Sequence, residues 1–319
     1  MKLFFLVLAG VLVAGGAHPC ALPDLPGVKR LTPDQIFSLR DRVPQGKGLK
    51  LREFRADGAR LWALMQTDSS DFAIVQTDLS GAFRYVTPLA RGTRASGLTD
   101  VSGGVATVLF KEKQAVLAQY ETDGRLLSEF PLRCTSAGDL VAIRGTPGVI
   151  CPDGTIATHS TATQLRTYHS WARPGGLVES LGAMQLAIVD QMTGQVLLND
   201  LEKGTITALT AETPELLEAR KRNATAAAAL QAAKPGQVVG RPLAVMDTAS
   251  GSLDLFLLVY PYQKRDGPSV VRLSPSGQIV ARYLCETPDG VEDSYHKIEV
   301  QNGFLYLASV SGKVFRYKI

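Results

Sequence analysis

The sequence predicts an all-β protein: a single β-propeller of six blades, with the N-terminal segment closing the last blade and one helical insertion at about 213–234. Three observations support this fold class. Strands of about six to eight residues with alternating apolar and polar positions recur along the chain, separated by Gly, Asp, Ser or Asn. These strands fall into groups of four, each about 40 residues long. The last group, which ends at Ile319, has only three strands.

The first blade has the clearest pattern. Its expected strands are LKLREFRA (49–56), RLWALMQ (60–66), FAIVQTD (72–78) and AFRYVTPL (82–89). The segments between these strands, ADG, TDSSD and LSG, favour tight hairpin turns. Four consecutive antiparallel strands of this length are typical of one propeller blade.

The same unit accounts for the rest of the chain. The second blade is expected at about 97–132 and the third at about 138–169, and the fourth runs from LVESLG to TITALT. The fifth runs from PLAVMDT to QIVARYLC, and the sixth from KIEV to the C-terminus. ETDGRLLSEF (121–130) is then the turn between the third and fourth strands of a blade. A pair of immunoglobulin-like sandwiches is the competing architecture, but the near-regular spacing of the groups favours the propeller.

The missing strand of the sixth blade predicts how the ring closes. A strand from the N-terminal segment, within about 26–42, can complete this blade and so remove an exposed sheet edge. TPDQIFSLRDRV (32–43) also fits a short helix, with Thr32 as its cap and Pro33 at its first position. Both interpretations of this segment remain open at the level of sequence.

The repeats resemble six-bladed β-propellers of the NHL-like type, in which strand, Asp-Gly turn, strand, gap, strand and Gly turn recur. The resemblance covers about residues 49–319 and implies architecture only. Similar propellers include binding modules, lyases, lactonases and esterases, so no activity follows from it. No blade carries the WD or kelch signature.

The N-terminus predicts export. MKLFFLVLAGVLVAGGA (1–17) has a basic residue at Lys2, an apolar core and small residues suited to cleavage. We interpret 1–17 as a signal peptide, 18–48 as an N-terminal segment with a possible closing strand, and 49–319 as the propeller domain of a secreted or periplasmic protein. A lipid anchor at Cys20 is the alternative, although the residues before it are not the small ones expected there. No other apolar segment is long enough for a membrane span.

Export would place the cysteines in an oxidising compartment, where disulfides persist. Four cysteines allow three pairings. The short spacing favours a bond between Cys134 and Cys151, which leaves Cys20 with Cys285. Metal binding by these thiols is disfavoured, because the sequence has no CxxC and no histidine close to any pair.

One segment has a helical composition. TPELLEARKRNATAAAALQAAK (213–234) is rich in good helix formers, with Thr213 at the N-cap and Pro214 at the first helical position. It lies between the fourth and fifth blades, where a helix packed on one blade is expected. Asn223-Ala224-Thr225 within it is a glycosylation sequon.

Candidate binding residues gather on one face of the predicted propeller. Loops between consecutive blades, and loops between the second and third strands of a blade, share this loop face. The candidates are Arg91, Arg94, Trp171, Arg173, Tyr262, Lys264, Glu292, Asp293, Tyr295 and His296. Both charge signs and aromatic rings favour a polar ligand or a peptide over a lipid. A carboxylate beside His296 can orient an imidazole for acid–base work, but a polar loop that caps its own backbone is the simpler interpretation.

The sequence carries no recognised catalytic motif. GxSxG, GxGxxG and the P-loop pattern are all absent, and the histidines lack metal-ligand spacing. No cofactor or metal is therefore predicted. The sequence leaves open a calcium ion in the central channel, bound by oxygen atoms of separate loops. The net charge of +4 is spread thinly, without the basic stripe that nucleic-acid binding needs.

These observations favour a secreted or periplasmic binding or scaffold module that recognises a peptide, glycan or protein partner on its loop face. The alternative is a lactonase-like hydrolase or lyase with a central divalent metal, in which Glu292 or His296 would serve as acid or base. The sequence leaves the choice between enzyme and binding module open.

Overall fold

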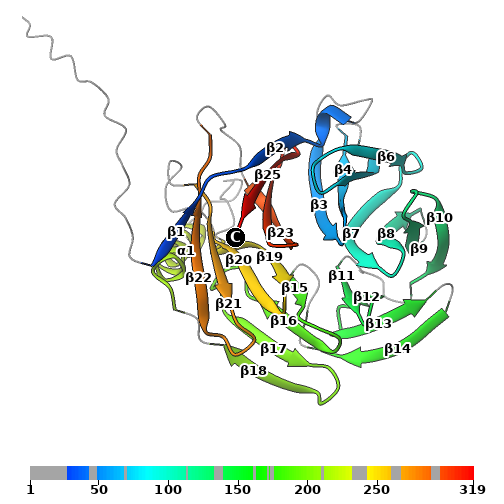
Figure 1. Ribbon diagram of the computed structural model, residues 1–319. Helices are drawn as coiled ribbons and strands as arrows, with labels where there is room; N and C mark the ends of the chain where they lie inside the picture. Colours follow the sequence, from blue (N-terminus) through cyan, green and yellow to red (C-terminus); the bar gives the residue numbers. More distant parts are fainter. Residues whose placement is uncertain are drawn as a thin grey trace, which may run out of the picture.

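The computed structural model describes residues 27–42, 49–67, 70–112, 114–132, 139–160, 163–170, 172, 176–209, 212–231, 243–259, 267–288 and 295–319. Six β-sheets in this part of the chain surround a central axis, and Figure 1 looks along that axis. The predicted all-β class and the single six-bladed propeller are confirmed, as is the architecture implied by the resemblance to NHL-like propellers.

Four blades are consecutive four-stranded antiparallel sheets. Blade I contains β3 (Lys50–Asp57), β4 (Arg60–Gln66), β5 (Phe72–Asp78) and β6 (Phe83–Pro88), and blade II contains β7 (Arg94–Val101), β8 (Gly104–Lys111), β9 (Gln114–Glu121) and β10 (Leu126–Pro131). Blade III contains β11 (Leu140–Ile143), β12 (Thr146–Ile150), β13 (Thr155–Ser160) and β14 (Thr163–His169), and blade IV contains β15 (Leu177–Ser180), β16 (Gln185–Val189), β17 (Val196–Asp200) and β18 (Thr205–Leu209). The first strand of each blade lies nearest the axis (Figure 1).

The N-terminal segment contributes one strand to each of the last two blades. Blade V contains β19 (Val245–Gly251), β20 (Asp254–Val259), β21 (Ser269–Leu273) and β22 (Ile279–Cys285), and β1 (Val28–Leu31) adds a fifth strand parallel to β22. Blade VI contains β23 (Tyr295–Gln301), β24 (Phe304–Ser309) and β25 (Lys313–Lys318), and β2 (Gln35–Ser38) completes it antiparallel to β25. The predicted closing strand is confirmed.

The alternative helix at the start of this segment is wrong. Gln35 to Ser38 pair with β25 in regular register, and only Arg40–Arg42 form one turn of 3-10 helix, η1. The helical pattern fails because the free edge of β25 offers a row of backbone donors and acceptors that an extended segment satisfies.

Apolar side chains between neighbouring blades form the core. In β4 the residues from Leu61 to Met65 are all buried, whereas the outermost strand β6 has no buried residue. A middle strand is covered on both faces by adjacent blades, so its sequence is a continuous run of apolar residues. An outer strand is polar or alternates between apolar and polar residues. Burial between blades thus explains which of the predicted strands are the most hydrophobic.

Two glycines show how closely the chain packs. Gly124 of the ETDG turn has a φ of 82°, which glycine adopts without strain, and the Asp123 carboxylate accepts a hydrogen bond from the Arg125 amide at 2.9 Å. Gly81 has a φ of 79°, and a Cβ atom there would lie 2.4 Å from Cγ of Phe37. The ring of Phe37 in β2 therefore rests directly on a turn of blade I.

The predicted helical insertion is confirmed as α1 (Pro214–Gln231). Thr213 caps it, because its Oγ1 accepts a hydrogen bond from the Leu216 amide at 3.2 Å. Leu216 and Ala219 are fully buried in the core cluster between blades IV and V, and Glu215 accepts from Arg282 Nε of β22 at 3.0 Å. The first half of the helix is thus fixed to both blades. No helix in the described part of the chain is long and apolar enough to cross a membrane.

We expect Asn223 to be a structural residue rather than a glycan carrier. Its side chain is 9% exposed, and Nδ2, the atom a glycan would occupy, donates to the Met192 carbonyl at 2.6 Å. Asn223→Ala is therefore expected to lower the free energy of unfolding by about 1–2 kcal/mol in urea titration. Thr225→Ala, at an exposed position of the same sequon, should change it by less than about 0.5 kcal/mol. Equal effects of the two substitutions would contradict this assignment.

Cys285 corrects one of the two predicted disulfides. It is a free cysteine with no exposed surface, packed among apolar side chains of blades V and VI, and burial raises the pKa of its thiol. A bond between Cys20 and Cys285 is therefore wrong, because Cys285 is a free thiol sealed among apolar side chains between two blades. Cys151 is buried in blade III. Cys134 and Cys20 lie outside the described residues, so the pairing of Cys134 with Cys151 stays a prediction.

Candidate functional site

The inner strands of five blades bring charged side chains to the axis. β3 contributes Glu53 and Arg55, β7 contributes Asp100, β15 contributes Glu179, β19 contributes Asp247, and β23 contributes Lys297 and Glu299. We call these seven residues the axial charge cluster. It holds five carboxylates and two cations, an excess of negative charge around the axis, and Asp100 is its exposed member.

Arg55 crosses the channel. Its Nη1 donates to Glu299 of blade VI at 2.8 Å and to Glu179 of blade IV at 3.1 Å, and its Nε donates to the Leu98 carbonyl of blade II at 3.0 Å. The inner strands contact one another in chain order around the ring, so blade IV lies opposite blade I. One guanidinium therefore ties four blades together across the axis. Its planar set of donors suits this role better than a lysine would.

A second set of contacts lies nearer the loop face. Nζ of Lys297 is 2.7 Å from Oε2 of Glu53 and 3.7 Å from Oδ1 of Asp247. The other oxygen of Asp247 accepts a hydrogen bond from the Ile298 amide at 2.9 Å. These contacts link blades V, VI and I, so both cations of the axial charge cluster are paired with carboxylates of other strands.

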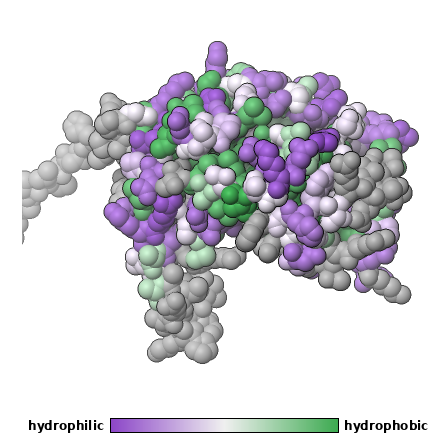
Figure 2. Space-filling view, turned by 90° about the horizontal axis from the view of Figure 1, so that it is seen from below, coloured by the Kyte–Doolittle hydropathy of each residue, from purple (hydrophilic) through white to green (hydrophobic). Residues whose placement is uncertain are grey.

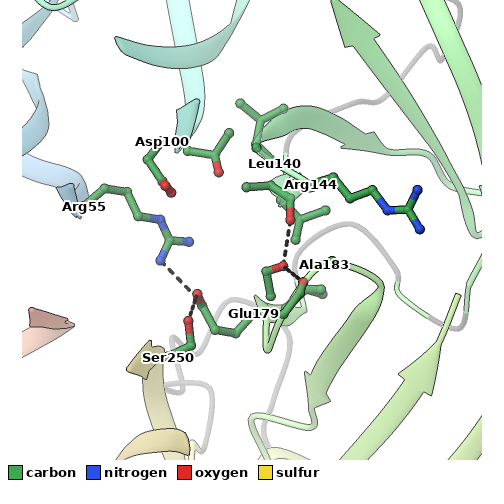
Figure 3. A pocket seen from close by; sticks show the side chains of 14 residues that line it. Arg55, Asp100, Leu140, Arg144, Glu179, Ala183 and Ser250 are labelled. Atoms are coloured by element: carbon green, nitrogen blue, oxygen red, sulfur yellow. Dashed lines mark hydrogen bonds and ion pairs between the residues drawn. The ribbon is translucent and has the colours of Figure 1, made fainter. Parts of the chain in front are cut away.

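Arg55 lines two cavities along the channel. The lower cavity, of about 340 Å³, lies at the end of the channel where the hairpin turns are short, and the upper cavity, of about 190 Å³, opens toward the loop face. Polar residues of the lower cavity include Arg55, Thr99, Asp100, Arg144, Glu179, Ser180 and Ser250. Figure 3 shows Arg55 and Asp100 on one side of it and Glu179 with Ser250 on another. The channel thus contains two recesses that carry polar groups in their walls.

Burial shifts four carboxyl groups of the cluster, those of Asp100, Glu179, Asp247 and Glu299, toward their protonated forms. It raises the pKa of Glu299 to about 8, with repulsion from Glu179 adding to the shift and Arg55 opposing it. The pKa values of Glu179, Asp247 and Asp100 are also raised by burial, and Arg55 again opposes the shift. A group of carboxylates at the axis with raised pKa values is a recognised mark of a functional site, although ion-pair networks produce it too.

These shifts predict that stability falls as the pH rises. Glu299 binds its proton more tightly in the folded state than at its usual pKa of 4.5, so its contribution is complete below that value and is lost through about pH 8. His159 and His296, whose pKa values burial lowers to about 4, act in the opposite sense, but only below their usual 6.5. We therefore expect the urea midpoint to fall between pH 6.5 and 8.

Glu299→Gln provides the test of this assignment. The amide resembles the protonated carboxyl group, so the variant should lose a measurable part of the fall in urea midpoint between pH 6.5 and 8. Glu112→Gln, which removes the same charge from an exposed loop position, should keep the wild-type profile. An unchanged profile in Glu299→Gln would show that this carboxyl group titrates normally.

The carboxylates of the cluster do not form a metal centre. In the part of the chain that the structure describes, no three His, Cys, Asp or Glu side chains lie close enough to hold a metal ion together. Glu179, Glu299, Glu53 and Asp247 are instead engaged by Arg55, Lys297 and backbone amides. A calcium ion needs six to eight oxygen ligands around one point, which these described residues do not present.

Four of the ten predicted binding residues lie in the described part of the chain. Arg91 and Arg94 are exposed where blade II begins, on the loop face. Tyr295 is 9% exposed, packs against Phe315 with ring centroids 5.1 Å apart, and so belongs to the core of blade VI. Half-buried His296 has Nε2 3.1 Å from the Leu51 carbonyl. The structure does not bring the two arginines together with this pair.

The other six predicted binding residues, Trp171, Arg173, Tyr262, Lys264, Glu292 and Asp293, lie outside the described residues. Their role on the loop face stays a prediction. The axial charge cluster was missed at the level of sequence, because each member is a single charged residue within an apolar strand. A usable signal exists: charged residues recur inside the inner strand of successive blades, as in LREFRA, LVES, VMDT and KIEV.

Exposed apolar side chains do not mark a second site. The most exposed are Leu253 (59%) and Leu127 (55%), which lie on different blades. Figure 2 shows one side of the propeller, where polar residues surround smaller apolar areas. Single exposed apolar residues are normal on soluble proteins. The axial cavities are therefore the better candidate site.

Comparison with known proteins defines the class as β-propeller and goes no further. No protein-family model matches the chain, and no curated protein matches its sequence.

Solved structures resemble it in fold. A chain of the mitotic checkpoint complex matches with a TM-score of 0.55 at 12% identity, over 99% of each chain. A catalytically inactive variant of virginiamycin B lyase from Staphylococcus aureus, solved with quinupristin, matches with a TM-score of 0.50 at 12% identity, over 86% of this chain and 82% of that one. BamB from Moraxella catarrhalis matches with a TM-score of 0.48 at 12% identity, over 91% of this chain and all of the other. At such identities the likeness shows the fold alone.

Proposed function

We propose that the protein is an exported binding or scaffold propeller that recognises a polar group of a peptide, glycan or protein partner in the lower cavity of its channel. The observation that carries this proposal is the position of Arg55, which reaches Glu179 across the axis and forms part of the wall of a recess that carries polar groups. A recess of this size admits a small molecule or a side chain that protrudes from a larger partner.

The axial charge cluster supports a binding function because it makes the recess rigid. Arg55 and Lys297 together contact residues of blades I, II, IV, V and VI, so the wall of the cavity is held before a ligand arrives. Polar groups that are fixed in advance lose little conformational entropy on binding. The short hairpin turns at this mouth add to the rigidity.

The loop face is the second candidate surface. The upper cavity opens toward it and is lined by Asp139, Gln191 and Lys297 among others. The exposed Arg91 and Arg94 lie on the same face. A peptide, glycan or protein partner with acidic groups fits this surface, and its binding would depend on the two arginines rather than on the lower cavity.

A lactonase-like hydrolase or lyase is a weaker alternative. That activity would require carboxylates that converge on a central divalent metal, and the described carboxylates are paired with Arg55 and Lys297 instead. Glu292 lies outside the described residues, and burial holds His296 neutral with a pKa of about 4.

Export is part of the same proposal. The leader at 1–17 and Cys20 lie outside the described residues, so secretion or a periplasmic location remains our inference from the sequence. N-terminal sequencing of the purified protein from its natural host should begin near residue 18. An intact leader in the mature protein would overturn this part of the proposal.

A pair of tryptophan variants tests the proposed site. Ala183 is exposed in a turn that lines the lower cavity, and Ala59 is exposed in the equivalent turn of blade I but does not line it. A ligand selected from a random peptide library or a glycan array should lose at least about tenfold in affinity with Ala183→Trp and keep it with Ala59→Trp. Retained affinity in Ala183→Trp, with loss in Arg91→Ala or Arg94→Ala, would move the site to the loop face.

A further inference from the structure

Asp100 is the carboxylate of the lower cavity that is left for a ligand. It lies near the end of β7, faces the solvent of the cavity, and receives a hydrogen bond from its own backbone amide. No other residue in the described part of the chain donates to it. Both oxygens of Glu179, by contrast, already accept hydrogen bonds, from Ser250 at 3.1 Å and from Arg55 at 3.1 Å. Asp100 thus has unused acceptors directed into a preformed recess (Figure 3).

The charges around this cavity do not balance. Arg55 lies among Glu179, Glu299 and Asp100, of which Glu179 and Asp100 line the cavity, so one cation faces two carboxylates there. Arg144 also lines the cavity, but its guanidinium points away from the carboxylates in Figure 3, and its Nη2 is 4.0 Å from Glu202 at the surface. It does little to neutralise the cavity. A positively charged ligand group would restore the balance.

The protonation of the cluster agrees with this imbalance. Burial raises the pKa of Asp100, and Asp57 adds to the shift while Arg55 opposes it. Burial raises the pKa of Glu179 as well, with contributions in the same sense from Asp100 and Asp247. The raised pKa values of Asp100 and Glu179 favour their neutral forms, and Glu299, with a pKa of about 8, binds a proton at neutral pH. A cation that enters would favour the ionised carboxylates and release protons, by the reciprocity of linked binding.

We propose that the ligand group of the lower cavity is a cation, an amine or a guanidinium, held by Asp100 with Glu179 behind it. This inference rests on the proposed function and names its ligand class. The source of the group is either a small molecule or the lysine or arginine side chain of a peptide. The Arg55–Glu179 pair fixes the floor of the site, and the hydroxyl of Ser180 and the backbone of the β15–β16 turn line its mouth.

Calorimetry with three small probes tests the ligand class. Agmatine carries both an amine and a guanidinium, glutarate is an anion, and glucose is neutral. We expect the full mature protein to bind agmatine and to bind glutarate and glucose much more weakly. Asp100→Asn, which keeps the shape of the side chain and removes its charge, should weaken agmatine binding by about tenfold or more. Glu112→Gln, the exposed charge control, should leave it unchanged.

Two further readouts separate this site from adventitious charge attraction. Agmatine binding should be lost in Ala183→Trp and retained in Ala59→Trp. At pH 7.5, the binding enthalpy should depend on the ionisation enthalpy of the buffer in the sense of proton release. Equal agmatine affinity in wild type and Asp100→Asn would overturn the inference.

The outcome also distinguishes this inference from the proposed function. Tight binding of glutarate or glucose that Ala183→Trp abolishes would overturn the cationic ligand and leave the lower cavity as the binding site. The protein could also bind none of the three probes and still bind a library ligand whose affinity falls in Ala183→Trp. That result would likewise overturn only the ligand class. Failure of both tests would overturn the inference and the proposed function together.

Discussion

Arg55→Ala is expected to lower the free energy of unfolding by about 3–5 kcal/mol, the usual cost of removing one partner from a buried ion pair. The side chain is 19% exposed and bonds to two carboxylates, which would be left buried without their cation. Urea titration at pH 7 measures the effect. We expect part of the loss to be recovered at pH 5, because burial raises the pKa of both Glu179 and Glu299 and so favours their neutral forms as the pH falls.

Arg60→Ala is the matched control for this substitution. Arg60 lies in the same hairpin of blade I, with its side chain 38% exposed and Nη1 3.5 Å from Asp57. Such surface pairs contribute at most about 1 kcal/mol. Similar small losses in both variants would show that Arg55 is solvated and does not bridge the blades.

Phe37→Ala is expected to destabilise the protein by about 2–4 kcal/mol, because it removes the main apolar anchor of the closing strand. Phe37 pairs with Val314 of β25, packs against the core cluster between blades VI and I, and covers Gly81. Without this anchor, the edge of β25 is free and the propeller opens between blades I and VI. Thermal or urea unfolding of the full mature chain measures the loss.

Ile36→Ala tests the same strand on its other face. Ile36 is adjacent in sequence, pairs with Phe315 and has a side chain that is 43% exposed. Its truncation should cost less than about 1 kcal/mol, because little apolar surface is removed from the core. If Ile36→Ala were as damaging as Phe37→Ala, the register of β2 on β25 would be shifted by one residue.

The blades were predictable from sequence because each is a local structure. Consecutive antiparallel strands joined by turns such as ETDG leave a signal within about 40 residues, and a last blade with three strands indicates that a strand must come from elsewhere. β1 was not predicted. VKRL is only four residues long, lacks an alternating pattern, and pairs in parallel with a strand some 250 residues away, as in Leu31 opposite Cys285. No local pattern encodes such a contact.

The candidate site was much less predictable. Arg55 and Glu179 are 124 residues apart in sequence and meet only because their blades are opposite each other in the ring. From sequence alone, a single charged residue in an apolar strand is interpreted as solvent-exposed. Only the arrangement of the blades in the ring shows that such residues meet at the axis. Tyr295 was predicted to be a binding residue because it lies beside His296 in a polar segment. The structure instead places its ring in the core of blade VI.

A double-mutant cycle between Arg55 and Glu179 tests the central claim most directly. The claim is that these side chains meet across the axis and join opposite blades. Unfolding free energies of Arg55→Met, Glu179→Gln and the double variant should give a coupling energy of about 1.5 kcal/mol or more, since contacting charged residues on opposite blades depend on each other. Additivity within about 0.5 kcal/mol would contradict the claim, because it would show that the two side chains do not interact across the axis.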